Sequence, residues 1–110
     1  MIDLWYRRVI FTDLLRQLYG RIKDAGLCPA KGRDGDKHME GSLHYLGLAD
    51  DPVIYDKDGK WLDSYETYLP YGLWWEAQHP DARWGGRFLN PDGSPGRDAN
   101  HFSLTYQGKS

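Results

Sequence analysis

Two short segments, about half the chain apart, hold the side chains that most constrain how this sequence can fold. His44 and Asp51 lie near the middle of the chain, and Asp98 and His101 lie near its end. A catalytic zinc usually takes three ligands from His, Asp, Glu or Cys and leaves its fourth position to a water whose pKa falls to about 7. If His44, Asp51 and His101 bind one ion, the fold must bring both segments together.

A hydrolytic metal site also needs a group that moves protons. A carboxylate beside the metal can take the proton from the zinc-bound water as the water attacks a carbonyl, and can later pass it to the leaving amine. Asp98 lies three residues before His101 and is the candidate.

Both segments resemble the zinc site of a known peptidase family. Residues 42–51 fit the pattern Ser-x-His-x-x-Gly-x-Ala-x-Asp, and residues 98–102 fit Asp/Glu-x-x-His-Phe/Trp. These patterns are similar to the two halves of the zinc site in the D-Ala-D-Ala carboxypeptidase and VanY/VanX family. The resemblance implies one Zn²⁺ with a carboxylate base beside it. The implied residues are the ligands His44, Asp51 and His101 and the base Asp98.

A narrower resemblance covers the chain from about Gly41 onward. Four segments are similar to the compact phage-encoded enzymes that cut peptidoglycan: residues 58–60, 65–80, 83–86 and 100–103. The resemblance implies a lysis enzyme that hydrolyses a peptide bond in bacterial peptidoglycan stem peptides. The bond is either L-Ala-D-Glu or a link containing D-Ala, and the resemblance does not choose between them.

Three further residues are candidates for contacts with substrate. Arg33 is the nearest match to an arginine that polarises the substrate carbonyl in such enzymes. Ser42, two residues before His44, is a candidate for orienting that region by hydrogen bonding. Trp84 precedes Gly85-Gly86, where the backbone can approach the site closely and form its wall.

Composition predicts one domain and excludes several classes of protein. One hundred and ten residues suffice for a single modest core. No run of residues is long and apolar enough for a membrane span, and the first residues lack the apolar run of a signal peptide. The net charge of -2, with dispersed basic residues, argues against nucleic acid. We expect a monomer made in the host cytoplasm that reaches the cell wall after holin-type release or from a virion.

The apolar pattern predicts an α+β fold with two helices on a small, mainly antiparallel sheet. Residues 3–25 have helical periodicity, with Asp3 as N-cap and Gly26 as the stop. A second helix is predicted from Ser64 to Gln78, with Pro70 in its first turn. Residues 28–41 are expected to form a loop. Strands are expected at residues 45–55 and 61–62, around the Asp58-Gly59 turn, and at residues 101–106.

Side-chain alternation in a strand raises a question about the third ligand. His44 and Asp51 are seven residues apart and would point to opposite faces of a regular strand, whereas His44 and Asp50 would share a face. The family pattern selects Asp51, which requires a bend or bulge at Gly47 or Pro52, or requires His44 to precede the strand. Asp50 is the alternative ligand.

The rival interpretation is a non-catalytic or degenerate module that binds the cell wall and keeps the metal as a structural element. A structural zinc normally has four protein ligands and needs no adjacent base, which favours an enzyme. Cys28 is expected to be an unreactive, partly buried thiol, and His79 is expected to be structural at the end of the second helix.

Overall fold

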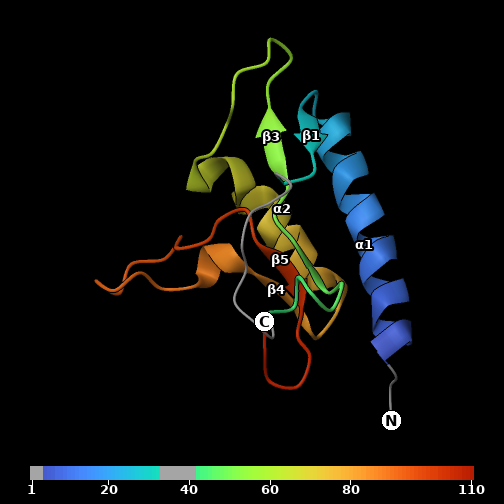
Figure 1. The fold of residues 1–110 in the computed structure, drawn as a ribbon. Helices are drawn as coiled ribbons and strands as arrows, with labels where there is room; N and C mark the ends of the chain where they lie inside the picture. Colours follow the sequence, from blue (N-terminus) through green and yellow to red (C-terminus); the bar gives the residue numbers. More distant parts are fainter. Residues whose placement is uncertain (1–3, 33–41) are drawn as a thin grey trace.

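The computed structural model describes residues 4–32 and 42–110, and it confirms the α+β fold (Figure 1). Two helices accompany two small antiparallel sheets. One sheet pairs β1 with β3, and the other has the strand order β2-β5-β4. The elements are α1 (Leu4–Asp24), β1 (Cys28–Ala30), β2 (Ala49–Asp50), β3 (Val53–Tyr55), α2 (Tyr65–Gln78), β4 (Ala82–Trp84), the 3₁₀ turn η1 (Gly85–Arg87) and β5 (Phe102–Leu104).

Helix α1 packs on the core through a single stripe of side chains. Its buried residues are spaced by three or four positions, as expected for one helix face: Phe11, Leu14, Leu18 and Ile22. The helix continues through Gly20, and Gly26 ends it as predicted. Gly26 has a positive φ of 83°, and the amide of Leu27 donates to the carbonyl of Ile22 at 3.2 Å. The predicted N-cap, Asp3, lies outside the described residues.

Helix α2 begins where the sequence predicts, but its proline lies deeper than expected. The Ser64 side chain caps the helix by accepting from the Thr67 amide at 3.2 Å, and the helix ends at Gln78. Pro70 is inside the helix, in its second turn, which corrects the first-turn prediction. Pro70 and Glu66 are both exposed, so water can satisfy the carbonyl that lacks a proline N–H donor.

The strands are shorter than the sequence pattern predicted. Residues 43–47 form a turn, so only β2 and β3 remain of the long strand expected over residues 45–55. The predicted hairpin is confirmed by a bridge between Tyr55 and Trp61 around the Asp58-Gly59 turn. Strand β1 lies within the segment expected to be a loop, because it pairs with β3. The last strand covers three of the six predicted residues.

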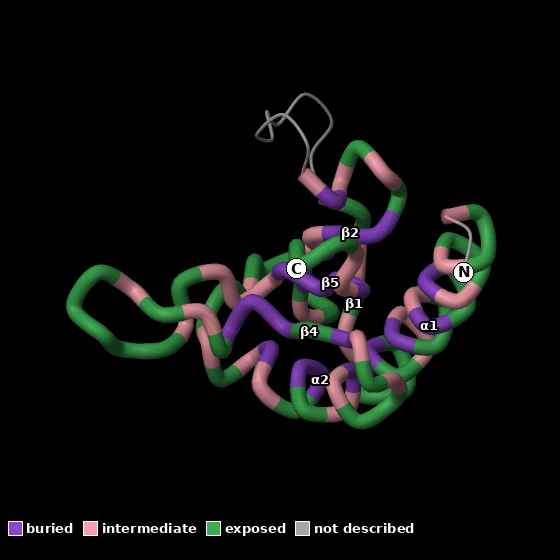
Figure 2. The backbone as a smooth tube through the Cα atoms, turned by 90° about the horizontal axis from the view of Figure 1, so that it is seen from below, coloured by how far each residue is buried: buried purple, intermediate pink, exposed green. Residues whose placement is uncertain are grey.

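Strand β5 is central in its sheet and is buried on both faces. Phe102, Ser103 and Leu104 are each 0% exposed. The ring of Phe102 packs against Trp75 of α2, with centroids 5.6 Å apart, and the indole N–H of Trp75 donates to the carbonyl of Ser103 at 2.9 Å. Figure 2 shows this buried centre between β4, β5 and the inner faces of both helices, with exposed backbone outside. Core packing therefore holds the segment that directly follows His101.

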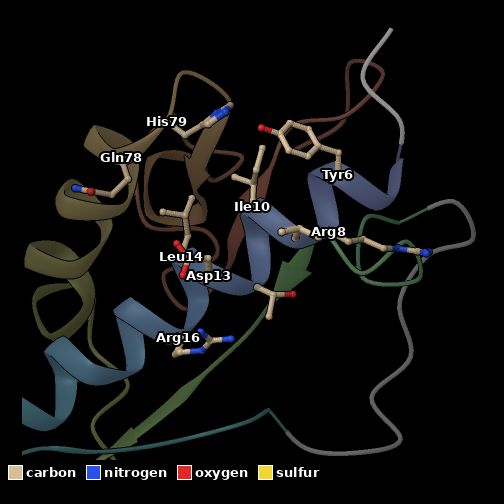
Figure 3. Close-up of a pocket in the computed structure, with 10 residues that line it drawn as sticks. Tyr6, Arg8, Ile10, Asp13, Leu14, Arg16, Gln78 and His79 are labelled. Carbon is tan, nitrogen blue, oxygen red and sulfur yellow. The ribbon is translucent and has the colours of Figure 1, made fainter.

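An open groove of about 610 Å³ lies between the N-terminal half of α1 and the C-terminal end of α2 (Figure 3). Tyr6, Ile10 and Leu14 line it from α1, and Gln78 and His79 line it from the other side. His79 has a structural contact, as expected, because its Nδ1 accepts from the backbone amide of Asp81 at 3.0 Å. None of the predicted ligands lines this groove.

In the two described ranges, no helix combines the length and the apolar character needed to cross a membrane.

Two glycines in the helices offer a matched test of the packing. A methyl group at Gly72 would overlap the ring of Trp84, whereas a methyl group at Gly20 would meet no atom within 4 Å. We expect Gly72→Ala to lower the free energy of unfolding by about 2 kcal/mol or more through overpacking. Gly20→Ala should raise it by about 0.5–1 kcal/mol, because alanine loses less backbone entropy in a helix. Urea denaturation of both variants measures these changes, and equal effects would contradict the packing of Trp84 on α2.

Candidate metal centre

His44 lies in a tight turn before β2 rather than in a strand. The amides of Gly47 and Leu48 donate to the carbonyls of His44 and Leu43, at 3.2 and 2.9 Å, and Gly47 has a positive φ of 74°. Ser42 has the predicted orienting role, since its Oγ accepts from the His44 amide at 3.2 Å. The turn is therefore braced by its own backbone and by the serine side chain.

The two neighbouring aspartates face different partners. The carboxylate of Asp51 lies 3.3 Å from Nε2 of His44. The carboxylate of Asp50 instead accepts a hydrogen bond of 2.9 Å from the hydroxyl of Tyr19 in α1. Because His44 precedes the strand, alternation does not bring Asp50 to the histidine side, and Asp51 is the member of the cluster.

His101 enters from a second turn, at the start of β5. Its amide donates to the carbonyl of Asp98 at 3.0 Å, so residues 98–100 are irregular, as the motif required. The amide of Gly85 donates to the carbonyl of His101 at 2.7 Å. A Cβ at Gly85 would overlap the carbonyl of Asp98 and lie 2.7 Å from Cβ of His101, so this close approach requires glycine.

Trp84 supports the same turn from inside the molecule. Its side chain is 1% exposed, and its indole N–H donates to the carbonyl of Ala99 at 2.6 Å. This burial corrects the expectation of a substrate contact, because the ring presents no face to a ligand. Arg33, the candidate for polarising the carbonyl, lies outside the described residues.

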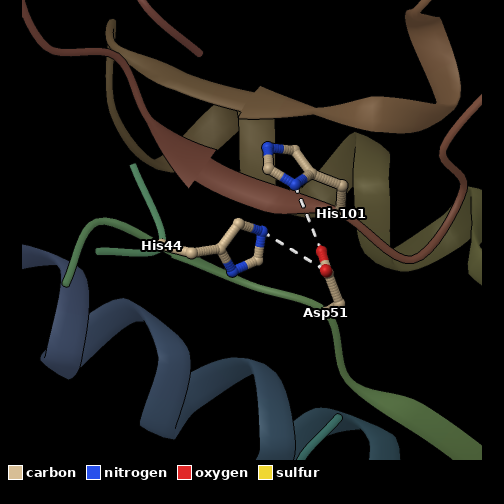
Figure 4. A group of neighbouring side chains, drawn as sticks. All are labelled: His44, Asp51 and His101. Carbon is tan, nitrogen blue, oxygen red and sulfur yellow. Dashed lines mark hydrogen bonds and ion pairs between the residues drawn. The ribbon is translucent and has the colours of Figure 1, made fainter. Parts of the chain in front are cut away.

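Two imidazoles and one carboxylate converge in this centre (Figure 4). Nδ1 of His101 lies 3.1 Å from Oδ1 of Asp51, and Nε2 of His44 lies 3.3 Å from Oδ2. All three ligand atoms lie within 4.8 Å of one another. Two ligands bound tetrahedrally at about 2.0–2.1 Å from one zinc are about 3.3 Å apart. The three side chains could therefore hold a metal ion with small adjustments.

Asp98 lies beside the cluster without belonging to it. Its Oδ2 is 3.8 Å from Nδ1 of His101, and its side chain is 45% exposed while that of His101 is 8% exposed. Burial raises the pKa of Asp98, and the nearby Asp51 charge acts in the same direction, although the His101 charge opposes both. A carboxylate with a raised pKa at the rim of a metal centre is suited to accept and return a proton.

The charges inside the cluster stabilise each other. Burial alone would raise the pKa of Asp51, but hydrogen bonds from His101 and His44 hold that pKa well below its usual range. Burial alone would lower the pKa of His44, but its hydrogen bond to Asp51 and the charges of the nearby carboxylates raise it overall. The Asp51 carboxylate is therefore the negatively charged partner of both imidazoles.

Several contacts around the centre could not be predicted from any pattern in the sequence. Tyr19 reaches Asp50 across 31 positions, and the ring of Phe88 lies 5.7 Å from the ring of His101. Tyr19 belongs to an ordinary amphipathic helix and Phe88 to an irregular segment. Cys28 is an exposed free thiol, which corrects the expected partial burial, and it is not part of the cluster.

No protein-family model matches this chain, and no curated protein sequence matches it. The geometry of the centre and the two sequence motifs are therefore the basis for a function.

Replacing each neighbouring aspartate separates the true ligand from the alternative. We expect Asp51→Asn to weaken metal binding by at least about 100-fold, because even groups outside the ligand set cost about 10–100-fold. Asp50→Asn should cost less than about tenfold, because asparagine can still accept from Tyr19. Competition with a chromophoric chelator measures both affinities. The reverse order would make Asp50 the ligand.

Metal affinity should rise with pH. A protonated imidazole cannot bind a metal, and the raised pKa of His44 extends proton competition above the ordinary histidine range. Below that pKa, each displaced proton should change the affinity by about tenfold per pH unit. Asp50→Asn should shift this profile to lower pH, because Asp50 is one of the charges that raise the pKa of His44. Chelator titrations from pH 5 to 8 measure the profile, and an affinity independent of pH would contradict it.

Proposed function

We propose that this protein is a zinc-dependent peptidase that hydrolyses a peptide bond in the stem peptides of bacterial peptidoglycan. The observation that carries the proposal is the convergence of His44, Asp51 and His101, with the accessible carboxylate of Asp98 3.8 Å from Nδ1 of His101. Two imidazoles and one carboxylate are a donor set that suits zinc, and three protein ligands leave a coordination position open.

Bound Zn²⁺ would supply a Lewis acid at the scissile carbonyl and lower the pKa of water. The protein's own residues do the rest. The backbone of His101 is held in place because its amide donates to the carbonyl of Asp98 at 3.0 Å and its carbonyl accepts from the amide of Gly85 at 2.7 Å. Asp98 accepts a proton from the attacking water and returns it to the leaving amine nitrogen.

The choice of substrate rests on the resemblance of residues 42–51 and 98–102 to the D-Ala-D-Ala carboxypeptidase and VanY/VanX family, and on the further likeness to phage peptidoglycan enzymes. These support bacterial peptidoglycan as the partner, with cleavage at L-Ala-D-Glu or at a D-Ala link. The alternative is a module that binds the cell wall around a structural metal. The half-exposed Asp98 favours the enzyme, because a structural metal has no need for an acid and base at its open side.

Removing the proposed base should stop catalysis and leave the metal in place. We expect Asp98→Asn to reduce kcat by about 10²–10⁴-fold, the usual contribution of a general base. Its zinc content should equal that of the unaltered protein, because Asp98 is not a ligand. Mass spectrometry of fragments released from purified murein measures the activity and identifies the bond.

Two matched variants control this experiment. Asp92→Asn removes an exposed carboxylate in the neighbouring turn and keeps an acceptor oxygen for Ser94, so it should retain full activity. His101→Ala should lose both zinc and activity. If the unaltered, zinc-loaded protein binds murein but releases no fragment, the peptidase proposal is wrong and the cell-wall-binding module is supported instead.

A further inference from the structure

Arg97 is a cation at the rim of the centre, next to Asp98. Its guanidinium carbon lies 5.5 Å from the centroid of the Phe88 ring, and the residue is exposed. Within residues 4–32 and 42–110, its guanidinium has this ring contact and neither an ion pair nor a hydrogen bond. The five N–H donors are therefore available for a ligand.

The backbone holds Arg97 in a defined place. Its amide donates to the carbonyl of Phe88 at 3.1 Å, and the amide of Gly96 donates to the carbonyl of Gly86 at 2.7 Å. Gly96 has a positive φ of 96°, which bends the chain back toward Phe88. The Phe88 ring in turn lies 5.7 Å from the ring of His101. Phe88 thus connects the arginine to a ligand of the candidate metal.

The negative charges around the centre would make a nearby cation useful for binding an anionic substrate. Three carboxylates, on Asp50, Asp51 and Asp98, act on the two imidazoles or on each other. They would repel an anionic substrate that approached from the side of Asp98. A guanidinium is a planar fork that matches the two oxygens of a carboxylate, and stacking on an aromatic ring orients it in advance.

We propose that Arg97 binds a carboxylate of the substrate on the leaving side of the scissile bond. This inference rests on the proposed function. Asp98 returns a proton to the leaving amine, and Arg97 is close enough for its charge to act on the Asp98 carboxylate. In both candidate bonds, the carboxylate belongs to the first residue after the bond. The chemical class is the free α-carboxylate of a D-amino acid, as in D-Glu linked through its γ-carboxylate or in a terminal D-Ala.

Two pairs of small probes test the inference by binding alone. One pair is γ-D-glutamyl-L-lysine and its α-amide, D-isoglutaminyl-L-lysine, and the other is D-alanine and D-alaninamide. Calorimetric titration of the zinc-loaded protein should show one carboxylate binding about tenfold more tightly than its amide, as expected for a charged hydrogen bond at an exposed site. The pair that discriminates identifies the source of the carboxylate, and so the bond that is cut.

Three arginine variants assign the discrimination to Arg97. Arg97→Gln should reduce it to less than about twofold, and Arg97→Lys should retain part of it, because lysine keeps the charge and loses the fork. Arg21→Gln is the matched control, since Arg21 is also exposed and lies 5.0 Å from the ring centroid of Trp74. This control should discriminate like the unaltered protein.

The outcomes separate this inference from the proposed function. Equal binding of carboxylates and amides, or equal discrimination in Arg97→Gln, overturns the role of Arg97 even if the protein hydrolyses murein. If the unaltered protein prefers the carboxylate over its amide and Arg97→Gln loses this preference, the role of Arg97 is supported. This holds even if the zinc-loaded protein releases no fragment from murein, in which case only the proposed hydrolysis is withdrawn.

Discussion

The Asp51 carboxylate, held between two imidazoles, is the interaction on which the arrangement of the centre depends. Its two oxygens lie 3.3 Å from Nε2 of His44 and 3.1 Å from Nδ1 of His101, two residues separated by more than half of the chain. Burying a carboxylate, even in part, is costly unless it is paired, and the partly buried Asp51 is paired with a partly buried His44 and a buried His101. The antiparallel pairing of Asp50 with Phe102 brings the two segments close enough for this arrangement.

The aromatic core supports the centre by direct hydrogen bonds as well as by packing. Trp84 donates to the carbonyl of Ala99, and Trp75 donates to the carbonyl of Ser103, so two buried indoles hold the backbone on both sides of His101. The high aromatic content of a small chain thus serves two purposes. The rings bury apolar surface, and their N–H groups donate to backbone carbonyls.

The centre has an interior side and an accessible side. The three candidate ligands lie toward the interior, while the Asp98 carboxylate and the Arg97 guanidinium lie on the side open to solvent. This division suits a hydrolase, because ligands must be held rigidly while groups that contact a substrate must be reached from outside. The short elements around the centre, mostly turns, are typical of sites that handle ligands.

The sequence alone determined the fold class, the C-terminal end of α1, both ends of α2 and the ligand candidates, because caps, stops and motif spacing act over a few residues. It could not determine strand lengths or the place of Pro70. It also left the choice between Asp50 and Asp51 open, because alternation depends on where regular backbone begins. The tertiary structure decided that choice: Arg8 of α1 donates to the carbonyl of Leu46, and Tyr19 draws Asp50 toward the helix. The packing of α1 therefore sets which aspartate faces the histidines, and local sequence carries no record of such distant contacts.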